Sequence, residues 1–69
     1  MSDLNTRLLA AHDAGDNDTL VTLYTAAADQ SRDIDAECFF LTHAYVFALE
    51  LGHPDTPTLK SRLKHHGRV

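Results

Sequence analysis

The chain has 69 residues, of which 43% are hydrophobic and 23% charged, and its formal net charge is −4. A chain of this length forms one domain, residues 1–69, and buries only about 60% of the surface that its unfolded form exposes, which leaves room for partner contacts. The composition excludes a disordered or low-complexity protein, and the single cysteine, Cys38, excludes an intramolecular disulfide and a zinc site of several thiolates.

The lone cysteine also indicates a reducing compartment. The first residues, MSDLNTRLLAAHDAG, contain no basic stretch followed by an apolar one. The apolar run at 38–51 is interrupted by polar residues and is too short to span a bilayer. We therefore expect a cytoplasmic protein with no membrane segment.

The first predicted helix covers residues 3–14, with Ser2 or Asp3 as its N-cap. Its apolar side chains follow a helical period: Leu4, Leu8 and Ala11. Gly15 ends it, because glycine adopts the left-handed conformation that closes many helices.

A second helix is predicted over residues 17–30, capped by Asp16 or Asp18. The connection between the two helices is very short, so we expect them to pack antiparallel. The predicted buried side of this helix consists of Leu20, Leu23, Tyr24, Ala27 and Ala28.

The third helix, residues 33–51, holds the longest apolar run of the chain and ends at Gly52. Asp33 is its predicted N-cap, and Asp35 and Glu37 lie in the first turn, where the helix dipole favours acids. One stripe is expected to face the core: Phe40, Ala44, Phe47 and Leu51.

A second apolar set, Phe39, Val46 and Leu49, lies to the sides of that stripe. A helix that is apolar around most of its girth needs cover on more than one face. We therefore expect the third helix to be central, with part of its surface left for an interface.

The fourth helix is predicted over residues 57–66, with Thr56 as N-cap and Pro57 at the first helical position. Leu59 and Leu63 are its only strong apolar pair. No segment alternates as a β-strand would, so we predict an all-α fold of four short antiparallel helices arranged as two stacked hairpins.

A weak internal repeat accompanies this pattern. A shift of 37 residues aligns Gly15 with Gly52, and it also aligns Ala11 with Ala48, Asp18 with Asp55 and Thr19 with Thr56. Such a spacing is close to that of helical-hairpin repeats, in which each pair of helices buries its apolar face on the next pair.

The strings AYVFALELG and AHDAGDNDTLVTLYTAAAD resemble the second half of a tetratricopeptide or Sel1-like repeat, over residues 8–66. The chain departs from that motif, because the Trp-Leu-Gly start is absent and Pro54 comes early for the repeat-closing proline. The resemblance implies a tetratricopeptide-like pair of hairpins and a role in protein interaction. No functional residue carries over from it.

No pattern in the chain predicts a catalytic, cofactor or metal site. Cys38 and His43 are five residues apart and do not share a helix face, so we expect both to serve packing. The acids at 13, 16 and 18 lack the glycine and glutamate positions of an EF-hand. His65 and His66 point about 100° apart on a helix and cannot chelate together.

Charge divides the chain in two. Residues 1–56 hold all ten acids and two arginines, a net −8, whereas the tail holds four cations: Lys60, Arg62, Lys64 and Arg68. This basic patch is either a solvated helix end or a docking surface for the protein's own acids, a protein partner or nucleic acid. Four cations without interleaved aromatics, beside a net −8, argue against nucleic acid.

Our preferred hypothesis is a small interaction module that binds another protein or itself through apolar helix surface. The interface candidates are Phe39, Val46, Leu49, Leu59 and Leu63.

Two alternatives remain open. One is a small ligand-binding or enzymatic domain with a pocket near His43 and Glu50, or Tyr24 and Tyr45, and it requires these groups to converge on one cavity. The other is a nucleic-acid accessory protein that uses the basic patch.

Overall fold

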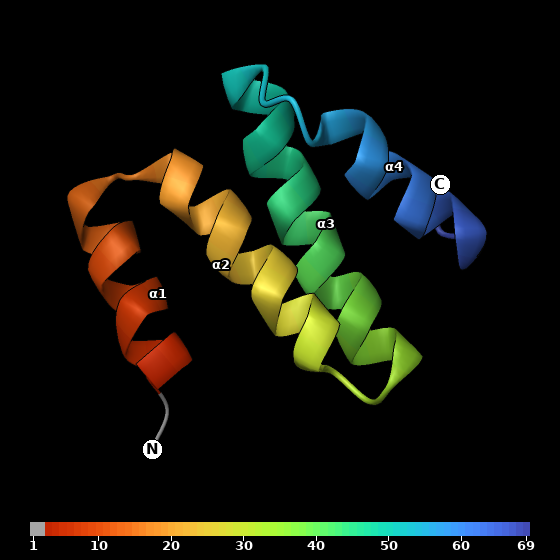
Figure 1. Cartoon of the computed structure of the whole chain (residues 1–69), viewed down its shortest axis with the longest axis horizontal. Coiled ribbons are helices and arrows are strands. Elements are labelled where there is room, and N and C mark those ends of the chain that lie inside the picture. The colour runs from red at the N-terminus through yellow and green to blue at the C-terminus, as the bar shows by residue number, and fades with distance from the viewer. Residues whose placement is uncertain (1–2) are drawn as a thin grey trace.

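The computed structural model describes residues 3–69 of the chain, which form four α-helices and no strand (Figure 1). The helices are α1 (Asp3–Ala14), α2 (Asn17–Gln30), α3 (Ile34–Leu51) and α4 (Thr56–His65). The all-α prediction is confirmed, and each helix begins and ends within one residue of its predicted position. The predicted N-cap of α1, Ser2 or the Asp3 side chain, lies outside the described part.

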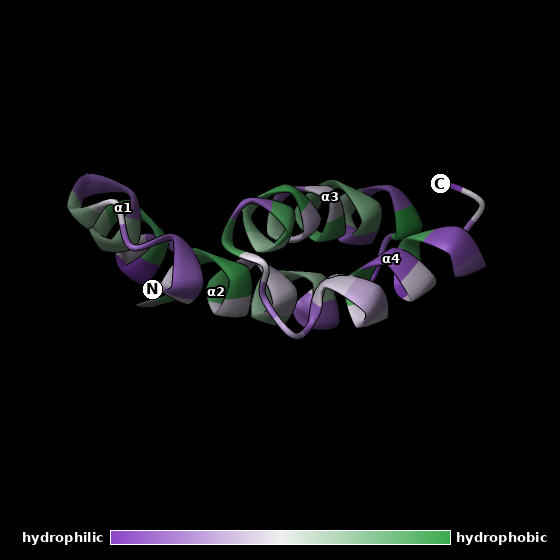
Figure 2. Ribbon diagram, turned by 90° about the horizontal axis from the view of Figure 1, so that it is seen from above, coloured by the Kyte–Doolittle hydropathy of each residue, from purple (hydrophilic) through white to green (hydrophobic). Residues whose placement is uncertain are grey.

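The four helices lie side by side in chain order and form a thin, flat molecule. Successive helices run in opposite directions, with α1 and α4 at opposite ends (Figure 1), and each packs on its neighbours in sequence. Packing between α2 and α3 is the most extensive. The molecule measures 31 × 29 × 12 Å, and α3 lies on one side of it, above α2 and α4 (Figure 2). One side of α3 therefore carries no covering helix.

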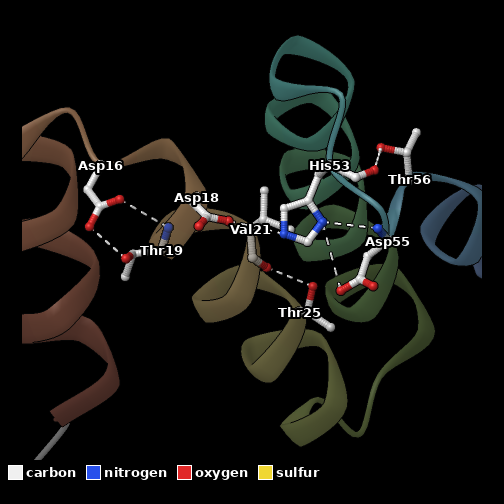
Figure 3. Close-up of polar contacts among 8 residues, drawn as sticks. All are labelled: Asp16, Asp18, Thr19, Val21, Thr25, His53, Asp55 and Thr56. Atoms are coloured by element: carbon white, nitrogen blue, oxygen red, sulfur yellow. Dashed lines mark hydrogen bonds and ion pairs between the residues drawn. The ribbon is translucent and has the colours of Figure 1, made fainter.

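Local signals set the helix ends. The carboxylate of Asp16 caps α2, since it accepts the backbone N–H of Thr19 at 3.3 Å and the Thr19 hydroxyl at 2.6 Å (Figure 3). These bonds, the hydroxyl first, hold the pKa of Asp16 below its ordinary value. Asp33 caps α3 through the N–H of Ala36 at 3.1 Å, as predicted. Gly52 closes α3 in the left-handed conformation, at φ 66°.

The start of α4 differs from the prediction. Thr56 is the first residue of the helix rather than its cap, and Asp55 takes the cap position, where its carbonyl accepts the N–H of Leu59 at 2.9 Å. Both the N–H and the hydroxyl of Thr56 donate to the carbonyl of His53. This double anchor folds the turn one residue earlier than Pro57 alone would indicate.

The core has two clusters of buried side chains. The larger lies where α3 meets α2 and α4 and consists of Val21, Ala28, Cys38, Leu41, Ala44, Ala48, Leu59 and Leu63. The smaller lies where α1 meets α2 and consists of Ala11, Leu20 and Leu23. In α2 the predicted buried side is confirmed, with Tyr24 half-buried. None of the helices between residues 3 and 69 is both long and apolar enough to cross a membrane.

The predicted core stripe of α3 was only partly right. Ala44 is buried, but Phe40 and Phe47 are half-buried and Leu51 is 45% exposed. Leu51 is the last residue of α3, whose C-terminal end extends beyond α2 (Figure 1), so no helix covers it. The buried line runs instead through Cys38, Leu41, Ala44 and Ala48, because small residues on this line let α2 approach closely.

Candidate interaction surface

One side of α3 faces away from the core. Phe39, Thr42, Val46 and Leu49 fall within an arc of about 80° on a helix that turns about 100° per residue. Leu41, Ala44 and Ala48 are buried on the opposite side of the helix, whereas the buried Cys38 lies next to the edge of this arc. We call Phe39, Thr42, Val46 and Leu49 the outer face.

The outer face is largely apolar and open to solvent. Phe39 is 57% exposed, Val46 46% and Leu49 54%. The hydroxyl of Thr42 donates to the carbonyl of Cys38 at 2.8 Å, so it needs no partner outside the helix. Scattered exposed apolar residues are normal, and these three lie along one stripe of one helix, with Thr42 between Phe39 and Val46.

Two of the predicted interface residues do not belong to a surface. Leu59 and Leu63 are each 1% exposed and lie in the core with Leu41 and Ala44. Their assignment as interface candidates is therefore corrected. These two leucines supply the apolar contacts that hold α4 against α3. The other side chains of α4 are mostly polar and cannot supply such contacts.

Charged side chains flank both ends of the outer face, with a bonded pair of opposite charges at one end and an acid at the other. At the Phe39 end, Arg68 donates to the carboxylate of Asp35 at 2.7 Å, and this hydrogen bond raises the pKa of Arg68. Arg68 and Phe39 both line a depression of about 300 Å³. At the Leu49 end lies Glu50, which is exposed and forms no ion pair within residues 3–69.

His43 borders the outer face. Its Nδ1 lies 2.9 Å from the carbonyl oxygen of Phe39. Since a carbonyl can only accept a hydrogen bond, Nδ1–H is the donor, and in the neutral ring Nε2 is therefore an acceptor. The ring is half-buried, and it stacks on Tyr24 with centroids 5.0 Å apart. His43 also lines an apolar depression of about 240 Å³ with Val46 and Phe47.

The polar groups of the alternative ligand site are only partly brought together, since Tyr24 stacks on His43 whereas Glu50 and Tyr45 line neither of its depressions. Neither depression that His43 lines includes Glu50, Tyr24 or Tyr45. The hydroxyl of Tyr24 is bonded instead to Nε2 of His12, at 2.9 Å. Among the described residues, these two depressions do not bring His43 together with Glu50 or Tyr45.

The predicted basic patch is divided by contacts with the protein's own acids. Arg62 lies 2.8 Å from Asp29 on α2 and 3.4 Å from Glu37 on α3, and Arg68 is held by Asp35. Glu37 also accepts a hydrogen bond from His66 at 3.2 Å, which is the main reason that its pKa is lowered. In the described part of the chain, Lys60 and Lys64 take part in no ion pair.

From the sequence, Thr42 was not assigned to this surface, and His43 was considered for packing or a ligand pocket and not as a residue that borders the outer face. The spacing of residues 39, 42, 46 and 49 in steps of three and four was the available signal. It was obscured because α3 also has apolar residues on its other sides.

No protein-family model matches this chain, and neither a curated protein nor a solved structure matches it. The functional assignment therefore depends on the geometry and chemistry of the residues described above.

Proposed function

We propose that this protein is a small cytoplasmic interaction module that binds a protein partner through the outer face of α3. The observation that carries the proposal is the row of exposed apolar residues Phe39, Val46 and Leu49 on α3, which packs on α2 and α4 and lies above them (Figure 2). Proteins rarely keep such a row in water without using it, because burying apolar surface is the main favourable term in association.

The size of this surface limits how it works. Fully burying one large apolar side chain contributes about 1.5–3 kcal/mol, so three side chains that are already half covered contribute about 3 kcal/mol together. Association costs at least about 4 kcal/mol in lost freedom of motion. A partner therefore also has to contact the flanking residues, including His43, whose Nε2 is available as an acceptor.

Two further features support an interaction module. The helices are arranged as two successive hairpins, the arrangement that the resemblance to tetratricopeptide-like repeats implies. The outward side of α4 is polar at Thr58, Lys60, Ser61 and Lys64, as expected for a helix that ends a row rather than one that continues it.

The compartment is part of the proposal. Cys38 is a buried, free thiol. A small protein that is stabilised by packing, without a disulfide between its described residues, fits a reducing compartment such as the cytoplasm.

Affinity capture with variants of the outer face tests the proposal. We expect the wild-type protein to retain a protein partner, and Leu49→Glu and the double variant Val46→Ala/Leu49→Ala to lose it. Thr58→Glu is the matched control, since it adds the same charge at an exposed position of α4. Circular dichroism checks that all variants keep their helices.

Retention of the same partner by Leu49→Glu and the wild type would overturn the proposal. So would a wild-type protein that binds neither another protein nor a second copy of itself.

A further inference from the structure

We propose that His53 is a proton-sensitive latch between the first turn of α2 and the connection that joins α3 to α4. A second proton on its imidazole ring changes which group of Asp55 the ring contacts, and this change rearranges the start of α4. The inference goes beyond the proposed function, because it uses no residue of the outer face.

The surroundings of the ring determine where the second proton binds. Nε2 of His53 lies 3.1 Å from the carboxylate of Asp18, and an ionised carboxylate only accepts, so the proton of the neutral ring is on Nε2. On the other side of the ring, Nδ1 accepts the backbone N–H of Asp55 at 3.0 Å (Figure 3). Nδ1 is therefore the ring nitrogen that takes up a further proton.

A proton on Nδ1 removes the contact with the backbone of Asp55. Nδ1–H is a donor, and two donors 3.0 Å apart do not bond to each other. The carboxylate of the same residue lies 3.9 Å from Nδ1, and it attracts the ring once the ring is charged. The protonated ring therefore exchanges the N–H of Asp55 for the carboxylate of Asp55.

Two carboxylates from different parts of the fold face the ring. Asp18 belongs to α2 and Asp55 to the connection before α4, and both side chains are exposed. From α4 the contact is neutral, since the Thr56 hydroxyl donates to the carbonyl of His53 at 2.8 Å. The ring itself is mostly buried, but in its charged form it has a carboxylate on each side, which compensates the burial of the charge.

The exchange reaches α4 through its N-cap. The carbonyl of Asp55 accepts the N–H of Leu59 at 2.9 Å, and the N–H of Thr56 donates to the carbonyl of His53 at 3.1 Å. The N–H that loses its acceptor thus belongs to the residue that caps the helix. We expect the connection and the first turn of α4 to change, whereas the buried Leu63 keeps the rest of α4 on α3.

Nuclear magnetic resonance of the isotope-labelled protein tests the latch. Between about pH 8 and about pH 5, histidines in general change their charge, whereas carboxylic acids in general stay ionised. The ring nitrogens of His53 are expected to change from the Nε2–H tautomer to the imidazolium. The amide proton of Asp55 should move upfield with the same midpoint, because it loses its hydrogen bond.

Two results of this titration overturn the inference. One is an Asp55 amide signal that stays in place while the His53 ring becomes charged. The other is a His53 ring that remains neutral over the whole pH range.

His53→Asn is the variant whose side chain does not change its charge. An asparagine oxygen still accepts the N–H two residues later, so the Asp55 amide signal is expected to stay in place over the same pH range. A shift as large as in the wild type would mean that another group causes it, and would overturn the assignment. Circular dichroism checks the fold of the variant, and the wild-type titration remains decisive if the variant does not fold.

Asp55→Asn tests the ion pair of the protonated ring. It keeps the backbone N–H but removes one carboxylate, so the midpoint of the transition should fall by about 0.3–0.7 pH unit, which is a 2–5-fold weaker binding of the proton. Asp13→Asn is the matched control, because Asp13 forms no ion pair within residues 3–69. Equal midpoints in the two variants overturn the exchange of contacts at Asp55.

Discussion

The imidazole of His53 links two parts of the chain that are distant in sequence (Figure 3). Its Nδ1 accepts the backbone N–H of Asp55 at 3.0 Å, so Nδ1 carries no proton, and Nε2–H donates to the carboxylate of Asp18 at 3.1 Å. The side chain is only 14% exposed. This neutral tautomer joins the first turn of α2 to the connection between α3 and α4. Asp18 and Asp55, the pair aligned by the internal repeat, both contact this one ring.

Substitution of His53 is expected to loosen this link. His53→Ala removes two hydrogen bonds and should lower the free energy of unfolding by about 1–3 kcal/mol, since each contributes about 0.5–1.5 kcal/mol net. His53→Asn should recover part of the loss, because an asparagine oxygen also accepts the N–H two residues later. Urea denaturation measures both. Equal losses in His53→Asn and His53→Ala would contradict the role of the Asp55 bond, and nitrogen NMR shifts report the tautomer directly.

Glu37 gives the fold a pH dependence. The hydrogen bond from His66, followed by the contact with Arg62, lowers the pKa of Glu37 from its ordinary value of 4.5. A carboxylate with a lowered pKa in the folded state stabilises the fold above its ordinary pKa, and this stabilisation is lost as the pH falls through the lowered value.

We therefore expect Glu37→Gln to be less stable than the wild type near pH 6, and the difference to fade below about pH 4. Urea midpoints across that range measure it. Asp13→Asn is the matched control, because Asp13 takes part in no ion pair among residues 3–69. A constant difference between wild type and Glu37→Gln at all pH values would show that charge is not involved.

At the scale of elements, α3 has two apolar sides, of which one is buried and the other is exposed to solvent. The side through Leu41, Ala44 and Ala48 is fully buried between α2 and α4, whereas Phe39 and Leu49 remain exposed. Both sides are apolar, but the buried side carries two alanines beside Leu41, whereas the exposed side carries larger residues. The position of the neighbouring helices decides which side forms the core.

Leucine-to-alanine substitutions on the two sides should differ strongly. Leu41 is 0% exposed, so Leu41→Ala leaves a cavity and is expected to cost about 2–5 kcal/mol of stability. Leu49→Ala, measured in dilute solution where the chain is monomeric, should cost less than about 1 kcal/mol. Urea denaturation of both variants makes the comparison. Similar losses would mean that the outer face is packed within the chain.

At the scale of the molecule, the helices are not equally stabilised, because α1 lies at one end of the row and packs mainly on α2. The helix α1 packs on α2 through Leu4, Leu8 and Ala11, and it meets α3 through the rings of His12 and Phe47, 6.1 Å apart. The α2–α3 pair, in contrast, is flanked by α1 on one side and by α4 on the other. Local opening of α1 should therefore require less free energy than opening of the α2–α3 pair.

Hydrogen exchange is expected to show this order. Amides of α1 should exchange first and those of α2 and α3 last, and Leu8→Ala should speed exchange in α1 while the α2–α3 pair stays protected. Mass spectrometry of peptides from each helix measures the rates. Simultaneous exchange of all helices would instead indicate a single cooperative unit.

The sequence by itself determined the four helices, most of their ends and their all-α fold. These features depend on signals that act within a few residues, such as the left-handed glycines at 15 and 52 and the cap at Asp33. Exposure of Phe39, Val46 and Leu49 also followed from the excess of apolar residues over the segments that could cover them.

Only the tertiary structure decided how α3 is oriented and which charges meet. A helix that is apolar all round has no single buried side in its sequence, so Leu41 could not be distinguished from Phe40 before α2 and α4 were in place. The same holds for Leu59 and Leu63, which became core rather than interface, and for Arg62, whose acidic partners lie on other helices. These contacts join residues that are far apart in the chain, and only packing brings them together.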